Sequence, residues 1–453
     1  MRRTILLAVT LGLVFCQCSS LARADEPQWK VGLAQIKVTP EHPVLLSGYP
    51  GRPKPFEKVA QDLYVKALML EDNAGNRGVI VTSDLLGFPA AVADPICERI
   101  EKETGLKRQQ ILLNSSHTHA GPVLSLKAPA KDAANAGEAF RTVEYTRQLQ
   151  DKVVEVVVQA IKRLEPAELS WGSGVVDFAM NRREFTPDGI ILGVNPRGLA
   201  DRSVPVMRIA GADKQPLAIL FGAATHGTTL TGTNYELCGD YAGFAQALVK
   251  ERYPKAQAMF MLGCAGDSNP YPRGTMELAK KHGKTLSDEV CRVLDGKLRK
   301  INGPLRIAFG QVELPLQAVP REELEKIATA KRDARSSGAK EMLAMLDRGE
   351  KPPDHYTCPV TVWQFGKDLT LVGLSGEVVV DYVTLLEKAL GPNQLWVAAY
   401  CNDVFGYLPS ARVLGEGGYE TRGLYAGGAG FFDSRAETVL VQKVRELAEQ
   451  VRK

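Results

Sequence analysis

The sequence predicts an α/β fold, because short runs rich in aliphatic and β-branched residues alternate with longer segments of helical periodicity. Six short runs predict strands, and these cover residues 78–83, 111–114, 217–222, 258–263, 369–374 and 395–399. Five amphipathic segments predict helices over residues 91–104, 144–163, 243–253, 277–300 and 437–452. The stretch 320–353, rich in Glu, Lys, Arg and Ala, predicts a helical hairpin inserted at the surface.

Residues 1–24 have the composition of a cleavable export signal. Arg2 and Arg3 precede an apolar stretch over residues 5–15, and Ala22-Arg23-Ala24 provides a small-residue cleavage site. We therefore expect an exported protein, periplasmic or secreted. Removing the leader takes away arginines and no acidic residue, so the formal charge of +4 falls toward zero and does not favour nucleic-acid binding. No later apolar run reaches the roughly 18 residues of a membrane span, and the scattered cysteines fix no disulfide pairing.

The predicted strand at 111–114 leads into Ser115-Ser116-His117-Thr118-His119-Ala120-Gly121-Pro122, in a chain that has six histidines in 453 residues. Side chains two positions apart project from the same face of a strand, so His117 and His119 are expected to point into one volume. Such a pair suits metal binding or acid–base catalysis. The alternative is a pair that only forms hydrogen bonds at the end of a strand.

Polar residues also follow other predicted strands. His226 comes after the strand at 217–222, Asp267 and Ser268 after 258–263, and Glu377 after 369–374. Because ligand sites in open α/β sheets lie at the carboxyl ends of strands, we expect these side chains to converge. Histidines combined with a carboxylate are typical of a zinc site. Taken singly, His226 could be a hydrogen-bonded strand-end histidine and Glu377 a solvated acid.

The chain resembles the catalytic domain of the neutral/alkaline, non-lysosomal ceramidase family. The residues that carry the resemblance are Val31-Gly32-Leu33-Ala34, Val38-Thr39-Pro40, Ser47-Gly48-Tyr49, the motif from Ser116 to Pro122, Asn181-Arg182, Tyr419-Glu420 and Leu424-Tyr425. The resemblance implies two central mixed β-sheets packed face to face and flanked by helices, with residues 25–453 forming this catalytic domain. The family's C-terminal β-sandwich domain is expected to be absent, since the sequence stops at Lys453 after a predicted helix.

The resemblance also implies the metal and its ligands. One Zn²⁺ per chain would be held by His117, His226, Glu377 and Tyr407. His119 would then take a proton and return it to the departing amine. Arg182 and Tyr419 would stabilise the developing oxyanion, although an ion-paired surface arginine and a buried core tyrosine are the alternatives.

The resemblance leaves the role of Ser268 open. The family's catalytic serine lies in a Gly-Asp/Asn-x-Ser-Pro-Asn loop, whereas residues 266–273 here read Gly-Asp-Ser-Asn-Pro-Tyr-Pro-Arg, one residue shorter before the serine and with Asn and Pro exchanged. Ser268 is therefore a candidate catalytic residue in a segment whose residue types also favour a simple turn. Asp267 and Arg273 are the candidates for orienting the substrate.

Three functions remain open at this point. The first is an exported zinc-dependent hydrolase of N-acyl amides that converts ceramide to a sphingoid base and a fatty acid. The second is a zinc hydrolase of the same fold that acts on another amide or ester. The third is a non-catalytic exported metal-binding protein. For an enzyme, the expected binding partner is its substrate, a small-molecule or lipid N-acyl amide. Peripheral contact with a membrane is compatible with this substrate. The sequence identifies no protein partner.

Overall fold

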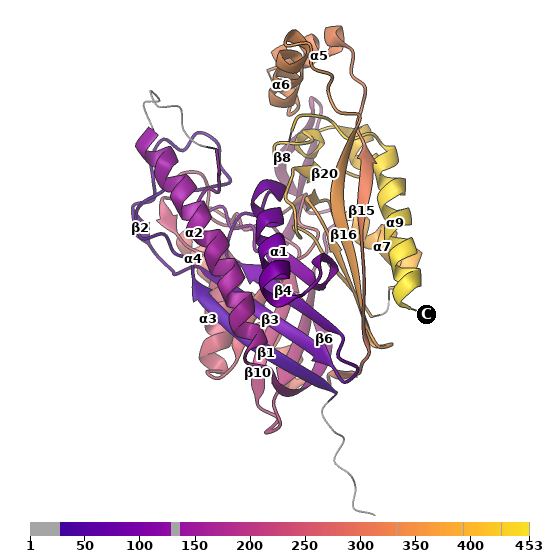
Figure 1. Ribbon diagram of the computed structural model, residues 1–453. Helices are drawn as coiled ribbons and strands as arrows, with labels where there is room; N and C mark the ends of the chain where they lie inside the picture. The colour runs from indigo at the N-terminus through magenta and orange to yellow at the C-terminus, as the bar shows by residue number, and fades with distance from the viewer. Residues whose placement is uncertain (1–27, 128–135, 332, 393, 427, 453) are drawn as a thin grey trace, which may run out of the picture.

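The computed structural model describes residues 28–127, 136–331, 333–392, 394–426 and 428–452. The predicted leader over residues 1–24 lies outside the described residues. Two mixed β-sheets form the centre of the molecule, and helices cover their outer faces (Figure 1). The predicted fold class is therefore confirmed.

Within the described ranges, the larger sheet has nine strands in the order β12-β10-β9-β6-β1-β3-β4-β5, with β14 paired to β6. Their bounds are β1 Trp29–Lys37, β3 Tyr64–Asp72, β4 Arg77–Ser83, β5 Ile111–Ser115, β6 Glu165–Val175, β9 Ser203–Ala210, β10 Pro216–Ala223, β12 Gln257–Leu262 and β14 Arg299–Ile301. Strand β5 runs parallel to β4, and β12 runs parallel to β10, whereas the central pairs are antiparallel. The parallel pairs lie at the two ends of this strand order, and the loops after β5, β10 and β12 carry the predicted site residues.

The second sheet has the order β15-β16-β17-β19, with bounds β15 Leu305–Pro315, β16 His355–Phe365, β17 Leu369–Leu374 and β19 Leu395–Ala398. Its inner face packs on the larger sheet. Trp363 and Leu371 share one buried cluster with Trp29 and Leu220 of the larger sheet. This cluster is the apolar layer between the two sheets, and burying such side chains contributes roughly 1.5–3 kcal/mol each.

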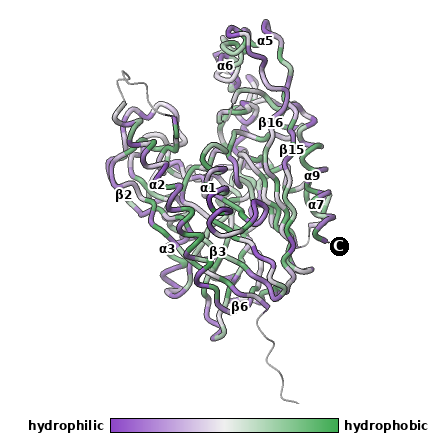
Figure 2. Tube along the Cα trace, viewed as in Figure 1, coloured by the Kyte–Doolittle hydropathy of each residue, from purple (hydrophilic) through white to green (hydrophobic). Residues whose placement is uncertain are grey.

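Helices cover both outer faces. Helices α1 (Ala90–Thr104) and α2 (Ala136–Ile161) pack on the β1-β3-β4-β5 half of the larger sheet, whereas α3 (Asp240–Arg252) and α4 (Met276–Asp295) cover the other half. Helices α7 (Asp381–Leu390) and α9 (Arg435–Val451) cover the second sheet. In α9 the buried residues Leu440, Val444, Leu447 and Val451 recur at helical spacing, and Figure 2 shows the resulting alternation of apolar and polar residues.

Each of the predicted strands and helices has a counterpart in the structure, with two clear errors of extent. The helix predicted over 144–163 corresponds to α2, which begins eight residues earlier, at Ala136. The helix predicted over 277–300 ends at Asp295, because the chain leaves the helix at Gly296 and residues 299–301 form the extended strand β14 beside β6. The stretch 320–353 contains α5 (Arg321–Thr329) and α6 (Ser336–Asp347), which pack against each other at the top of Figure 1. The cysteines within the described ranges are all free. No described helix has the length and apolar character needed to cross a bilayer.

Short elements complete the region around the site. The strands β7 (Ala179–Thr186), β8 (Gly189–Asn195) and β13 (Ser268–Pro270) form a small sheet in the order β13-β7-β8. Strands β18 (Glu377–Val378) and β20 (Tyr407–Leu408) pair in parallel, as do β2 (Lys58–Val59) and β11 (Glu236–Leu237). The 3₁₀ turn η1 (Arg108–Gln110), helix α8 (Ala411–Glu416) and the 3₁₀ turn η2 (Tyr419–Thr421) are the remaining elements.

Candidate metal centre and active site

The two histidines of the motif lie just beyond β5 and not within it. Strand β5 ends at Ser115, and His117 has a left-handed backbone with φ of 56°. The prediction that both histidines lie in a strand and project from one of its faces is therefore wrong. The side chains meet nevertheless, because the loop folds back and brings the Nε2 atoms of His117 and His119 to 3.2 Å.

A close contact between two loops fixes the position of this motif. Thr118 forms a parallel bridge with Gly227, and the His119 amide donates to the Gly227 carbonyl at 2.9 Å. A Cβ atom at position 227 would lie 2.6 Å from the His117 carbonyl oxygen, so only glycine fits there. The loop after β5 and the loop after β10 are thereby held side by side, and His226 joins the pair of histidines.

The short strands β18 and β20, which follow β17 and β19 of the second sheet in the chain, supply the carboxylate and a phenol. Glu377 in β18 lies opposite Tyr407 in β20. The Glu377 Oε2 atom is 2.9 Å from His226 Nε2 and 3.2 Å from His117 Nε2. The Tyr407 hydroxyl is 3.4 Å from His226 Nε2. The structure thus brings together four residues that the sequence analysis assigned to the metal, and His119 lies beside them; their roles remain predictions.

The hydrogen bonds of the rings show which nitrogen carries the proton. His117 Nδ1 lies 2.6 Å from the Leu86 carbonyl oxygen, and His226 Nδ1 lies 2.6 Å from the Ala265 carbonyl oxygen. A carbonyl oxygen only accepts, so both Nδ1 atoms donate and the neutral rings present lone pairs at Nε2. Both lone pairs face the Glu377 carboxylate. One proton can bridge Glu377 to only one of the two Nε2 atoms at a time. A metal ion can bind both Nε2 atoms and the carboxylate together, so these residues fit a cation.

Burial favours the neutral form of His226 and His119. It lowers the pKa of His226 to about 3, with the Arg182 charge adding to the effect. It also lowers the pKa of His119 well below the ordinary histidine value, with His117 and His226 contributing. His117, His119 and His226 are buried, and their ligand atoms lie within 4.8 Å of one another. Neutral imidazoles are the form that binds a metal, and His119 and His226 are therefore in that form near neutral pH.

A buried charge network lies behind Tyr407. Arg182 donates from Nη2 to the Tyr407 hydroxyl at 3.1 Å and from Nε to Glu420 at 2.9 Å. Its guanidinium group also lies over the rings of Tyr407 and Tyr419, at 5.4 and 5.6 Å. Glu420 accepts a second bond, at 2.6 Å, from Arg183. Arg182 is therefore a buried, paired cation next to the candidate metal centre and not a surface arginine.

Three residues of the site received no role from the sequence. They lie between Glu420 and Tyr425. Tyr425 donates to Glu377 Oε1 at 2.8 Å, Arg422 donates to the Tyr419 hydroxyl at 2.7 Å, and Glu420 holds Arg182. The signal for Glu420 and Tyr425 in the sequence is the family resemblance, which includes Tyr419-Glu420 and Leu424-Tyr425. The pattern of this segment gives no further signal, because it has neither strand alternation nor helical periodicity.

Ser268 lies at the start of β13, against His226. Its carbonyl oxygen accepts from the His226 amide at 3.0 Å. Its hydroxyl is buried and has no hydrogen-bond partner among the described residues. Asp267 next to it is fully buried and accepts from Asn181 at 3.0 Å and from the Val380 amide at 2.8 Å. Burial raises the pKa of Asp267 to about 6.

Two adjoining hollows open beside the candidate centre. One, of about 330 Å³, is lined by His119, Arg182, Tyr407 and Tyr419 together with Arg273 and the apolar residues Met180, Leu192 and Val194. The other, of about 300 Å³, reaches His117, Glu377 and Tyr425 and shares His119, Tyr407 and Tyr419 with the first. Arg273 donates to the Thr228 carbonyl and to the Tyr49 hydroxyl. Of the candidates for substrate contact, Arg273 thus lines a hollow, whereas Asp267 and Ser268 line neither.

Comparison with known families adds a second kind of observation. The model of the family "neutral/alkaline non-lysosomal ceramidase, N-terminal" matches residues 29–306. The chain belongs to this family. The neutral ceramidase of Pseudomonas aeruginosa is 25% identical over 256 residues, which cover 54% of this chain and 37% of that protein. Neutral ceramidase B of Dictyostelium discoideum is 25% identical over 194 residues, which cover 40% of this chain and 26% of that protein. The matched region therefore spans less than two thirds of the length of either relative.

Solved structures extend the likeness beyond residue 306. The crystal structure of neutral ceramidase from Pseudomonas aeruginosa matches 94% of this chain and 75% of that chain with a TM-score of 0.69 and 18% identity. A ceramidase complexed with C2 matches 94% of this chain and 76% of that chain with a TM-score of 0.72 and 18% identity. The neutral ceramidase fold therefore includes the elements that carry Glu377, Tyr407 and Tyr419.

Proposed function

We propose that this member of the neutral ceramidase family is an exported, zinc-dependent hydrolase that cleaves the N-acyl amide bond of ceramide. The observation that carries the proposal is the convergence of two imidazole lone pairs and a carboxylate at the wall of a largely apolar hollow. Family membership supports a lipid amide as the substrate.

The residues that would hold the zinc ion are His117, His226, Glu377 and Tyr407. When bound, zinc polarises a carbonyl oxygen and lowers the pKa of a coordinated water. The Tyr425 hydroxyl, bonded to the other oxygen of Glu377, orients that carboxylate. Outer hydrogen-bond partners of this kind fix the orientation of ligands and tune a metal site.

The remaining polar residues of the hollow handle protons and charge. His119 is neutral, and its Nδ1 atom has no hydrogen-bond partner among the described residues. It can therefore accept a proton during attack on the amide and return it to the departing amine. Arg182 and Tyr419 line the same hollow and can stabilise negative charge on the amide oxygen. The buried charge of Arg182 acts strongly because few water molecules screen it.

One observation favours a second substrate class. Ser268 lines neither hollow, and the segment 266–273 differs from the family pattern in length and order. A zinc hydrolase of the same fold that acts on another amide or on an ester is therefore the second candidate.

The test is a hydrolysis panel with purified protein. Ceramides of short and long chains, other N-acyl amides and simple esters are offered to zinc-loaded protein and to protein treated with a chelator. We expect metal-dependent release of fatty acid from ceramide. Cleavage of other amides or esters without ceramide cleavage would favour the second candidate, and metal binding without hydrolysis of any substrate would identify a non-catalytic metal-binding protein. Detection of the processed chain outside the cytoplasm tests the proposed export.

A further inference from the structure

The hairpin of β7 and β8 exposes large apolar side chains to solvent. Phe185 has 61% of its surface exposed and Ile191 has 47%, and Leu192 and Leu199 are also exposed. Aliphatic residues that are exposed singly are ordinary, but a group on one hairpin indicates an interaction surface. Strand β8 contacts the 3₁₀ turn η2, whose Tyr419 lines the hollow beside the candidate centre.

The exposed side chains project from both faces of the hairpin. Phe185 lies opposite Ile190, and Glu184 lies opposite Ile191. Because paired residues share a face and neighbours alternate, Phe185 and Ile191 project from opposite faces. A folded protein partner docked on one face would leave the other side chain in water. A fluid apolar medium can surround both.

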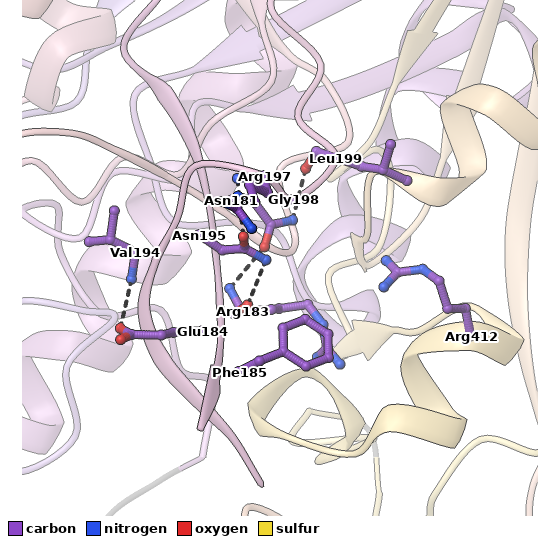
Figure 3. Close-up of a pocket in the computed structure, with 10 residues that line it drawn as sticks. All are labelled: Asn181, Arg183, Glu184, Phe185, Val194, Asn195, Arg197, Gly198, Leu199 and Arg412. Carbon is purple, nitrogen blue, oxygen red and sulfur yellow. Dashed lines mark hydrogen bonds between the residues drawn. The ribbon is translucent and has the colours of Figure 1, made fainter. Parts of the chain in front are cut away.

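The hairpin also forms a wall of the candidate active site. Leu192, Gly193 and Val194 of β8 line the hollow that contains His119 and Arg182. Phe185, Val194 and Leu199 line a third hollow, of about 520 Å³, which shares Val194 with the first and extends to Arg412 of α8 (Figure 3). The exposed apolar surface is therefore continuous with the mouth of the site through β8.

Polar residues limit how deeply the hairpin can enter an apolar medium. The turn between the strands contains Pro187 and Asp188, and Arg197 follows β8 as an exposed cation. A carboxylate is costly in hydrocarbon, whereas an arginine suits the phosphate groups of lipids. This arrangement fits contact at the depth of lipid headgroups, with the apolar side chains reaching the acyl boundary.

We propose that the β7–β8 hairpin docks the protein on the surface of a lipid bilayer and delivers a lipid from that surface to the adjoining hollow. The identity of the delivered lipid rests on the proposed function, whereas the docking does not.

The test measures binding to phosphatidylcholine vesicles by co-flotation, which needs no catalytic activity. The variant Phe185→Ser/Ile191→Ser removes an aromatic and a β-branched residue from the hairpin. The matched control, Phe140→Ser/Val439→Ser, removes the same classes of residue from α2 and α9, where they are 63% and 36% exposed. We expect the hairpin variant to lose about tenfold or more in vesicle affinity and the control to bind as the unmodified protein does. Hydrolysis of a monomeric short-chain amide should stay unchanged in both variants.

The proposal is overturned if the hairpin variant binds vesicles as well as the control does, or if both lose affinity equally. It is also overturned if the unmodified protein is a dimer, the hairpin variant is a monomer, and both bind vesicles with the same affinity. A second copy of the chain would then cover the hairpin. Vesicle binding in a protein that hydrolyses no amide would refute the proposed function and leave the docking surface supported.

Discussion

Among single side chains, the protonation of the histidine rings decides what the candidate centre can bind. The carbonyl oxygens of Leu86 and Ala265 hold the protons of His117 and His226 on Nδ1. The free Nε2 atoms therefore face Glu377 as acceptors. His119 differs, because no backbone group fixes its Nδ1 atom among the described residues. This difference separates the two candidate ligands from His119, the candidate for proton transfer.

We expect the purified protein to hold about one zinc ion per chain. His226→Ala should reduce metal affinity by on the order of 100-fold or more, since loss of an outer partner alone costs about 10–100-fold. His119→Ala should keep most of the metal and lose turnover. Elemental analysis beside kcat for each variant measures both effects.

The control for these histidine variants is His355→Ala, which removes an exposed histidine paired with Asp354 and should change neither value. If His119→Ala empties the site and His117→Ala does not, the roles of the two motif histidines are exchanged.

Replacing Ser268 by alanine should affect stability and activity differently. Its buried hydroxyl has no partner among the described residues, and such a group costs about 1–3 kcal/mol. Ser268→Ala should therefore leave Tm unchanged or raise it. If the hydroxyl acts on the substrate, kcat/KM should fall by on the order of 100-fold.

Thermal unfolding, metal content and kcat/KM of the Ser268 variant are measured together. Ser287→Ala, in α4, is the control for removing a buried serine at a distance from the hollows. Full activity in Ser268→Ala would show that the hydroxyl takes no part in the reaction and would favour the second substrate class.

At the level of elements, the segment around η2 organises one side of the site. Glu420 is fully buried and bridges Arg182 of β7 to Arg183, while Glu416 of α8 contacts only Arg183 of that pair. Glu420 thus determines where the Arg182 guanidinium lies relative to Tyr407. Figure 3 shows Arg183 among the residues that line the third hollow.

Glu420→Gln should lower kcat by about 10–100-fold, because small displacements of a positioned group carry penalties of that size. Metal content should stay near one ion per chain. The change also removes the carboxylate paired with buried Arg182, whereas Arg183 keeps Glu416. Stability should therefore fall by about 3–5 kcal/mol, and rates are compared at a temperature where the variant is folded. Glu416→Gln is the matched control, with kcat expected to be unchanged. Equal losses of kcat in the two variants would show a general structural effect.

The order of strands explains which parts of the site could be predicted from the sequence. His226 and Glu377 each follow an apolar strand closely, so the α/β rule places each of them at the carboxyl end of its strand. That the two ends meet follows from the packing of the two sheets, since β10 and β17 belong to different sheets. Tyr425 and Glu420 could not be found in this way, because hydrogen bonds to Glu377 and Arg182, and not periodicity, position them. The β7–β8 hairpin was missed since its apolar residues are exposed on both faces, which resembles neither a buried strand nor an alternating one.

For the molecule as a whole, hydrogen bonds of buried polar groups connect the second sheet to elements that pack on the first. Asp403, in the loop before β20, is 3% exposed and accepts from the Tyr356 hydroxyl of β16 at 2.7 Å and from the Ala90 amide of α1 at 2.8 Å. It therefore joins the second sheet to a helix that covers the first. Burial raises its pKa to about 6, against the hydrogen bonds that favour the ionised form.

This shift makes stability depend on pH in a defined direction. The pKa of an aspartate in the unfolded chain is about 3.9, so between about pH 4 and 6 the folded protein binds a proton at Asp403 that the unfolded chain has lost. The free energy of unfolding contributed by Asp403 therefore falls as pH rises through this window, by roughly 3 kcal/mol in total, and stays constant above it. Asp403→Asn removes this contribution, and the Tyr356 hydroxyl can rotate to accept from the new amide.

Denaturant unfolding of both proteins at several pH values between 4 and 8 measures the effect. We expect Asp403→Asn to gain stability relative to the unmodified protein as pH rises from 4 to 6, and the difference to be constant above pH 6. Asp267, whose pKa is also raised to about 6, contributes equally to both proteins and cancels in the comparison, as do the groups of the metal centre. A difference that does not vary with pH would mean that Asp403 is ionised in the folded protein throughout, and that its bonds to Tyr356 and Ala90 offset the cost of burying its charge.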